Sequence, residues 1–541
     1  MNFNNIKYER IDYDSVKKVY EEANSKIRSS TDFEEIKSII SSLNKTRVHL
    51  QTMKEVAAIK YSINTKDDYY VEENKYWDEY GPLYQDLDYN FYQTLLLIDF
   101  KDEIIEEYGQ QFYSLMVCQV KSFSKDIIGL LQEENRLMSD YTALLASAKI
   151  DFDGRVCNLS DMNYYMESLD DSVREDAIRA HTGFFEENEE HFDNIFDGLV
   201  KIRHQMALKM GYDSFVDIGY YRMQRIDYDR HMVADLRERV LDTYGPKAQA
   251  LYHDQAKRIG RDKIDYLCEK VEFPDGNAQP KADASQIFES GRRMYSSLSK
   301  ETKEFFDFLT SNDLFDVEAR ENKAMGGYCT VLPEYKMPFI FANFNGTVDD
   351  IDVLTHEAGH AFQMYMSRHI EMPELIFPTL DSCEIHSMSM EFFTYPWMDL
   401  FFGDDVEKYK TYHYASAVKF LPYGCLVDHF QHEIYKNPDM SPAQRKSTWR
   451  KLEKKYLPYR DYRDLDILNR GGYWFRQGHI FKDPFYYIDY VLAQLCALNF
   501  YKKMQEDYKL AWEDYIKICK LGGKYSFLNL VKVANIDNPF N

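Results

Sequence analysis

Apolar side chains recur at helical spacing over long stretches of the first 200 residues. Between Phe33 and Tyr61 they recur at near-helical spacing, at Ile36, Ile39, Ile40, Leu43, Val48 and Leu50. This spacing puts them on one face of a helix, which then packs against a core. Only 15 prolines and 23 glycines interrupt the 541 residues. The pattern therefore predicts a mainly α protein.

The pattern changes after a helical stretch that runs from near Ala284 to about Leu309. Two short runs of β-branched and aromatic residues follow, at 327–331 and 338–344, and glycine and proline bound them. Such runs are typical of strands, and these two are close enough in sequence to pair. Asn345 and Gly346 then form a turn signal. We expect a small β-sheet within a helical protein.

Length and charge bear on the number of lobes and on the partners of the protein. A chain of 541 residues exceeds the size at which one core usually divides, so we expect two lobes, with an approximate boundary between 1–195 and 196–541. The chain has 66 basic and 90 acidic residues, a net charge of −24. A surface with this charge repels phosphates, which argues against binding to nucleic acid.

The cysteines and the N-terminus bear on localisation. The eight cysteines are widely spaced and form no CxxC pair, which is typical of reduced thiols. The first 15 residues are polar and charged and lack the apolar segment of a secretion signal. No apolar run approaches the roughly 20 residues that a membrane helix needs. We expect a soluble, cytoplasmic protein that does not bind membranes.

A metal-binding motif follows the second predicted strand. Residues 347–350 (TVDD) resemble a capping box with Asp in place of Glu and predict a helix start. The helix then carries His356, Glu357 and His360 in an HExxH pattern. Histidines four residues apart lie on one helix face and can bind one ion, while the glutamate lies beside the metal as a general base. The motif predicts a catalytic zinc site.

A catalytic zinc ion needs a third protein ligand and keeps one open position. Glu384 lies 24 residues after His360, on a second helical stretch, and two histidines with one glutamate form a known catalytic set. His386 is two residues further and points away from Glu384 on a helix. Cys383 is better interpreted as a packing residue. Glu391 shares the face of Glu384 and could orient a ligand, or could be an exposed charge.

Two further groups of residues have the chemistry for a site. His429 and His432 lie three apart, but their aromatic and charged neighbours favour helix packing. Residues 469–479 form a glycine-punctuated loop that ends in His479 and leads, after Pro484, into a helix with several tyrosines. Phenol or imidazole donors beside the metal would stabilise an oxyanion. From the residues alone, ordinary packing of these tyrosines is the better interpretation.

Three stretches resemble a known family: FANFNGTVDDIDVLTHEAGHAFQ, EIHSMSMEFF and HIFKDPFYYIDY. They are similar to the thimet oligopeptidase and oligoendopeptidase F group of zinc metallopeptidases, closest to the oligoendopeptidase F and PZ-peptidase branch. The likeness runs from about residue 170 to the end. It implies a two-lobed, clam-like helical fold with a small sheet next to the active-site helix. It also implies a deep central channel that admits short peptides.

The resemblance also implies roles for individual residues. Glu384 would be the third ligand of one zinc ion per chain, and Glu357 the general base. His479, Tyr487 and Tyr490 would bind substrate and stabilise the oxyanion. Tyr486 stays an alternative as a substrate-binding residue, because the preceding loop varies in length between branches.

The resemblance assigns a substrate-binding role to the strand at 338–344 as well. It matches an edge strand along which an extended peptide pairs, through Phe341, Ala342 and Asn343.

The sequence thus predicts a zinc-dependent endopeptidase that hydrolyses internal bonds of short oligopeptides. One alternative is a metallo-carboxypeptidase, which needs a cation for the substrate carboxylate; Arg470 and Arg476 are candidates. Another is a non-catalytic, zinc-stapled peptide-binding protein, but Glu357 would have no use there. The sequence leaves open the cleavage preference, the physiological peptide, the oligomeric state and whether the native metal is zinc.

Overall fold

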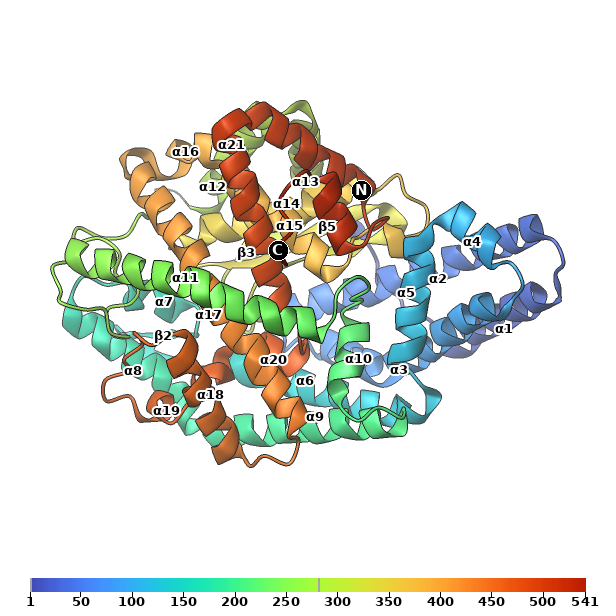
Figure 1. Cartoon of the computed structure of the whole chain (residues 1–541), viewed down its shortest axis with the longest axis horizontal. Helices are drawn as coiled ribbons and strands as arrows, with labels where there is room; N and C mark the ends of the chain where they lie inside the picture. Colours follow the sequence, from blue (N-terminus) through green and yellow to red (C-terminus); the bar gives the residue numbers. More distant parts are fainter. Residues whose placement is uncertain (1, 281–282) are drawn as a thin grey trace.

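The computed structural model describes residues 2–280 and 283–541, and it is built mainly of helices (Figure 1). The predicted mainly α class is confirmed. The α-helices are α1 (Tyr13–Ser29), α2 (Phe33–Ile63), α3 (Asp68–Leu97), α4 (Lys101–Tyr108), α5 (Gln110–Ser122), α6 (Ile128–Ala146), α7 (Asp161–Met166), α8 (Asp171–Glu187), α9 (Glu189–Lys209), α10 (Phe215–Arg222), α11 (Arg230–Arg258), α12 (Ala284–Leu298), α13 (Lys300–Ser311), α14 (Asp349–Ser367), α15 (Leu380–Phe393), α16 (Asp399–Phe402), α17 (Val406–Lys436), α18 (Pro442–Tyr456), α19 (Asp466–Asn469), α20 (Gly478–Lys482), α21 (Tyr487–Leu521) and α22 (Phe527–Val533).

The strands of the described residues form two small sheets. β1 (Ile150–Phe152) and β2 (Arg155–Cys157) make an antiparallel hairpin. β3 (Phe315–Glu318), β4 (Tyr328–Leu332) and β5 (Met337–Phe344) make a three-stranded sheet in the order β3-β5-β4. β5 pairs in parallel with β3 and antiparallel with β4, so the predicted pairing of the two strands is confirmed.

The prediction that 338–344 is an edge strand is wrong. β5 is the central strand, and both of its backbone edges are already paired with neighbours. Phe341 and Ala342 are completely buried. Asn343 is half-buried, and its amide donates to the carbonyl oxygens of Ala324 at 2.9 Å and Gly326 at 2.8 Å. These three residues support the sheet, and the edge strand on this side is β4.

Local hydrogen bonds show where the helices begin. Asp32 caps α2, which covers the predicted stretch from Phe33. The capping box predicted before α14 is wrong, because the Thr347 hydroxyl bonds to the Asn345 side chain and does not cap the helix. The Asp350 carboxylate accepts the backbone N–H groups of Asn345 at 2.8 Å and Gly346 at 2.9 Å. A carboxylate in the first turn also complements the helix dipole, so α14 still starts at Asp349.

The buried apolar side chains form two large clusters. One joins helices within 16–116 to the segment 364–376, and the other extends mainly from 123 to the C-terminus. In Figure 1 the first helices project to one side, while α21 rises from the middle of the remaining part to its upper edge. Helices α6 to α9 share the core of the C-terminal half, so these clusters divide near residue 120. The lobe boundary near 195 stays a prediction.

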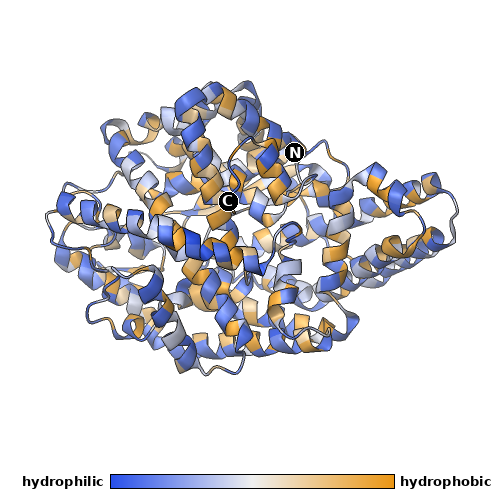
Figure 2. Cartoon of the chain, in the orientation of Figure 1, coloured by the Kyte–Doolittle hydropathy of each residue, from blue (hydrophilic) through white to orange (hydrophobic). Residues whose placement is uncertain are grey.

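Hydrophobic and hydrophilic residues alternate along the helices. Figure 2 shows both colours on the long helices, in keeping with helices that bury one face. Within the described residues, no helix combines the length and apolarity that a membrane crossing requires.

A buried ion pair links α6 to α9. Arg203 is fully buried and its Nε donates to Oε1 of Glu134 at 2.6 Å, while Arg222 contacts both oxygens of that carboxylate at 3.0 Å. Burial opposes the charge on Glu134, but the two guanidinium groups outweigh it and lower the pKa of Glu134 to about 2. Removing one partner of such a pair leaves a buried charge uncompensated.

We expect Glu134→Gln to lower the free energy of unfolding by about 3 kcal/mol at pH 7, from the pKa difference between 4.5 and about 2. Since the folded-state pKa is lowered, this stabilisation is complete above about pH 4.5 and is lost as pH falls toward 2. Urea unfolding of wild type and of Glu134→Gln at pH 7 and pH 3 measures the difference in their free energies of unfolding. A difference that stays constant or grows on acidification would contradict this assignment.

Candidate metal centre and active site

The HExxH helix α14 packs directly against α15. A glycine in the motif permits this approach: a Cβ atom added to Gly359 would lie 2.6 Å from the Cα of Ser387 and 2.9 Å from the carbonyl oxygen of His386. Those distances are too short for any side chain. Gly359 therefore lets α15 bring Glu384 onto the face that carries His356 and His360.

The three predicted ligands come together. Nε2 of His356 lies 3.2 Å from Oε2 of Glu384, and Nε2 of His360 lies 3.3 Å from the same oxygen. The three ligand atoms lie within 4.8 Å of one another, and Glu384 is almost completely buried. Ser387 and Tyr486 donate hydrogen bonds to the two oxygens of Glu384 and hold its carboxylate in place. This donor set suits a metal ion that prefers imidazole and carboxylate ligands.

Glu391 fixes the ring of His356 by bonding to its Nδ1 atom. Its Oε1 lies 2.7 Å from Nδ1 of His356, and its Oε2 lies 2.7 Å from Nε2 of His413. Tyr395 in turn bonds to Nδ1 of His413 at 2.6 Å. A carboxylate on Nδ1 leaves Nε2 of His356 free for a metal. Sequence reasoning missed His413, because α17 carries it 22 residues after Glu391.

Glu357 faces the cavity with a free carboxylate. It accepts no hydrogen bond from any described residue, and its Oε1 lies 3.4 Å from where a Cβ on Gly327 would be. Burial raises the pKa of Glu357 above its ordinary value, and the nearby His356 and His360 only partly offset this. A carboxylate with a raised pKa, next to the predicted metal ligands, is suited to accept a proton.

His479 and Tyr490 line the same cavity and bond to each other, with 3.0 Å between Nε2 and the phenol oxygen. Nδ1 of His479 accepts from the amide of Gln477 at 3.1 Å, and Tyr423 fixes that amide by donating to its oxygen at 2.8 Å. Burial lowers the pKa of His479 and thus favours the neutral ring, and with Nδ1 accepting from Gln477 the ring proton lies on Nε2. The Nε2–H group donates a hydrogen bond to the Tyr490 oxygen, so the O–H group of Tyr490 can donate to another acceptor.

The other tyrosines have different positions. Tyr486 lines the cavity and donates to Glu384. Tyr487 does not line the cavity; its ring packs against His479 with centroids 5.3 Å apart, and against Phe420 at 5.7 Å. Sequence reasoning missed Gln477 and Tyr423, since an amide and a distant tyrosine carry no motif. The glycine-punctuated loop was the available signal for Gln477.

The competing ligands considered in the sequence do not belong to the group formed by His356, His360 and Glu384. His386 bonds through Nδ1 to the Ser382 carbonyl oxygen at 2.9 Å and does not line the cavity. Cys383 does line it, but burial raises the pKa of its thiol well above the ordinary value. His432 bonds to Asp428 within α17, and His429 bonds to Tyr456 at 2.9 Å. The interpretation of these two histidines as packing residues agrees with these contacts.

The metal centre opens into a cavity of about 510 Å³, which we call the active-site cavity. Three walls surround it: the ligand helices α14 and α15, residues 476–490, and residues 325–329 at the start of β4. Helix α6 contributes Tyr141, Thr142 and Leu145. The edge strand β4, and not β5, therefore borders the space next to Glu357.

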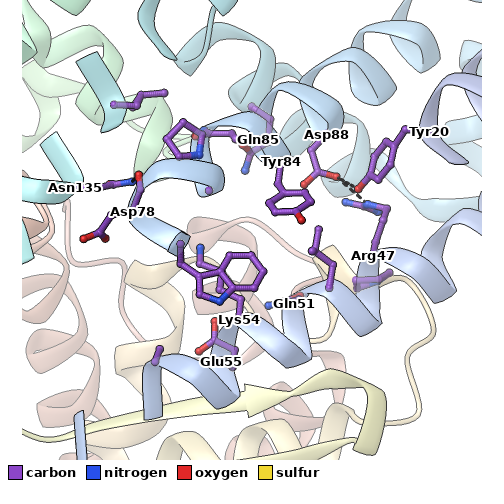
Figure 3. Close-up of a pocket in the computed structure, with 18 of the residues that line it drawn as sticks. Tyr20, Arg47, Gln51, Lys54, Glu55, Asp78, Tyr84, Gln85, Asp88 and Asn135 are labelled. Atoms are coloured by element: carbon purple, nitrogen blue, oxygen red, sulfur yellow. Dashed lines mark hydrogen bonds and ion pairs between the residues drawn. The ribbon is translucent and has the colours of Figure 1, made fainter. Parts of the chain in front are cut away.

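A second cavity of about 660 Å³ lies among α2, α3 and α6 (Figure 3). Arg47 and Tyr20 both bond to Asp88 in its wall, at 3.0 and 2.7 Å. Glu55, also in the wall, accepts a hydrogen bond of 2.7 Å from Thr330 of β4. This cavity thus lies beside the edge strand and contains none of the residues predicted for the site.

Comparisons with known proteins agree with this geometry. Residues 3–123 match the model of the peptidase M3 N-terminal domain, and residues 293–541 match peptidase family M3. An oligoendopeptidase F homologue of Borreliella burgdorferi is 23% identical over 453 residues, which cover 76% of this chain and 73% of that protein.

Solved structures are more similar still. PZ peptidase A, determined with an inhibitor, is 46% identical with a TM-score of 0.99, over 100% of this chain and 96% of that one. A Bacillus anthracis protein provisionally named oligoendopeptidase F is 46% identical with a TM-score of 0.94, over 100% and 95%. The chain therefore belongs to peptidase family M3, a family of peptide hydrolases.

Proposed function

We propose that this protein is a zinc-dependent endopeptidase that hydrolyses internal bonds of short oligopeptides. One observation carries the proposal: three ligand atoms, on His356, His360 and Glu384, converge within 4.8 Å, and the free carboxylate of Glu357 faces the same cavity. A purely structural site would have four protein ligands and no base beside them.

The ligand residues fit a zinc ion. Both Nε2 atoms face the same carboxylate oxygen, and Glu391 holds Nδ1 of His356, so the ligand nitrogen is oriented before any metal binds. When bound, zinc supplies a Lewis acid that polarises the scissile carbonyl and makes water easier to deprotonate. Two histidines and one glutamate leave an open position for this chemistry.

Glu357 acts as the general base. Its carboxylate takes a proton from the attacking water and later passes it to the amine of the leaving peptide. The raised pKa supports this role, since an acid that is too strong would not return the proton.

His479 and Tyr490 stabilise the oxyanion. With the Nε2 proton of His479 directed to the Tyr490 oxygen, the Tyr490 hydroxyl is polarised and donates toward the developing negative charge. Tyr486 serves mainly to hold Glu384, because its hydroxyl already donates to that carboxylate. Tyr487 supports the ring of His479 by packing against it.

The substrate backbone pairs with the start of β4. Residues 326–329 line the active-site cavity, and the last two of them begin the edge strand β4, so an extended peptide can add to it as a further strand. Residues of α6, α14 and α15 and of the segment 476–490 form its other walls, and a cavity of about 510 Å³ supports a preference for short, unfolded peptides over folded proteins.

A mixture of peptides tests the proposal. Zinc-loaded protein should cut internal bonds in peptides of about five to thirty residues. These peptides can bind as extended strands. Mass spectrometry of the products identifies the bonds, and the chelated protein serves as control. Stepwise loss of single C-terminal residues would favour the carboxypeptidase. The absence of any cleavage, with zinc bound, would favour the binding protein and overturn the proposal.

A further inference from the structure

Arg476 lies between two cavities. It ends the short 3₁₀-helix Tyr473–Arg476 and lines the active-site cavity together with His356 and Glu384. It also lines a smaller cavity of about 290 Å³, distinct from the cavity in Figure 3, which we call the side chamber. No other residue in the described part of the chain lines both cavities. The residue is half-buried, and it stands where the side chamber meets the active-site cavity.

Aromatic neighbours fix the guanidinium of Arg476. Its Nη1 donates to the Tyr266 hydroxyl at 2.7 Å, and its central carbon lies 4.4 Å from the ring centroid of Tyr473. Phe185 contributes a third ring at 5.4 Å. A guanidinium held by stacking and one hydrogen bond keeps most of its donors available in a defined orientation.

No carboxylate of the described residues lies within 4 Å of Arg476, although it is a half-buried charge. Its neighbours differ: Arg470 pairs with Glu189 at 2.7 Å, and Arg460 pairs with Glu269 of the side chamber at 2.5 Å. Charges removed from water are normally paired. An unpaired, pre-oriented guanidinium in a substrate cavity is suited to an anionic group of the ligand.

Lys482 is the other basic side chain, besides the histidines, that lines the active-site cavity among the described residues, and it is exposed. It forms no ion pair with a described residue, but no neighbour fixes it either. A carboxylate accepts two parallel hydrogen bonds from a guanidinium, whereas an ammonium offers only a point charge. The geometry therefore favours Arg476 as the anchor, and Lys482 provides a matched control.

We propose that Arg476 binds the C-terminal carboxylate of peptide substrates in the active-site cavity. The inference rests on the proposed peptidase function and adds a preferred substrate class, peptides with a free C-terminus. If the anchor fixes that end, the cut lies at a set distance from the C-terminus. Lengthening a peptide at its N-terminus should then leave the C-terminal product unchanged, and lengthening it at the C-terminus should move the cut.

Paired peptides test the anchor. One sequence is prepared as the free acid and as the C-terminal amide, and kcat/KM is measured for both. We expect wild type to prefer the acid by about tenfold to a hundredfold, mainly through KM, since a charge-assisted contact of this kind changes affinity on that scale. In Arg476→Gln the preference should fall to about one, and Arg476→Lys should retain part of it.

Lys482→Gln and Arg470→Gln are the controls and should keep the wild-type preference. Equal cleavage of acid and amide by wild type would overturn the proposal. So would a preference that survives in Arg476→Gln, or one that is lost in Lys482→Gln instead. Thermal unfolding and zinc content of each variant verify that the site is intact.

A binding measurement separates this proposal from the peptidase proposal. Calorimetry with Glu357→Gln compares the affinities of acid and amide in the absence of turnover. Tighter binding of the acid, abolished by adding Arg476→Gln, supports the anchor even if no peptide is hydrolysed by wild type. Equal affinities overturn the anchor even if wild type cuts both peptides.

Discussion

Glu357→Gln should lower kcat/KM for a short peptide by about a thousandfold, within the range of roughly 10²–10⁴ that general-base catalysis provides. Glutamine has the same shape as glutamate but cannot accept the proton. The Glu357 carboxylate has no hydrogen-bond partner among the described residues, so the change removes no structural contact. We expect unchanged zinc content and an unchanged unfolding temperature.

The control for this variant is Glu318→Gln. Glu318 is exposed on β3, at the opposite edge of the same sheet, so its substitution should leave kcat/KM unchanged. Hydrolysis by Glu357→Gln within about tenfold of wild type would exclude Glu357 as the base. Loss of zinc from the variant would instead give Glu357 a role in binding the metal.

Removing the metal should abolish hydrolysis and destabilise the protein. Without an ion, Glu384 stays buried beside His356 and His360, and the site has only its own ion pairs to compensate the burial of these groups. If zinc binds the folded chain only, an excess of about a thousandfold over Kd stabilises it by about 4 kcal/mol. Chelation should reverse this gain, and one equivalent of zinc should restore both activity and the unfolding temperature.

Glu384→Gln tests the same site. An amide is a poorer ligand than a carboxylate for zinc, so added zinc should restore neither activity nor stability at the same concentration. The matched control is Glu371→Gln, a change at an exposed residue after α14, which should respond to zinc like wild type. Full activity of the metal-free protein would overturn the mechanism.

The convergence of His356, His360 and Glu384 could be predicted from sequence because local geometry determines it. His356 and His360 are one helical turn apart, and Glu384 needs only one helix to return along α14. The hydrogen-bonded residues behind them could not be predicted, because His413 and Tyr423 reach the site from α17 through tertiary packing. Their types and spacing carry no separate signal.

The strand at 338–344 shows a different limit of sequence reasoning. Its residues were correctly predicted as a strand, but the order of strands depends on where β3 docks. Phe315 of β3 pairs with Ile340, across a connection that no local pattern describes. Likewise, the Thr347 hydroxyl has two possible partners, and Asn345 competes successfully with the helix N-terminus.

The edge strand β4 has a consequence for how the protein is made. An unpaired strand edge is a template on which other chains can aggregate. Helix α2 packs against β4, with Glu55 bonded to Thr330 and Thr52 accepting the backbone N–H of Glu334 just beyond the strand. Ribosomes synthesise the N-terminus first, so α2 is complete long before β4 leaves the ribosome. The order of elements along the chain therefore lets α2 shield β4 around Thr330 from neighbouring nascent chains as soon as the strand forms, whereas the residues that line the active-site cavity are 325–329.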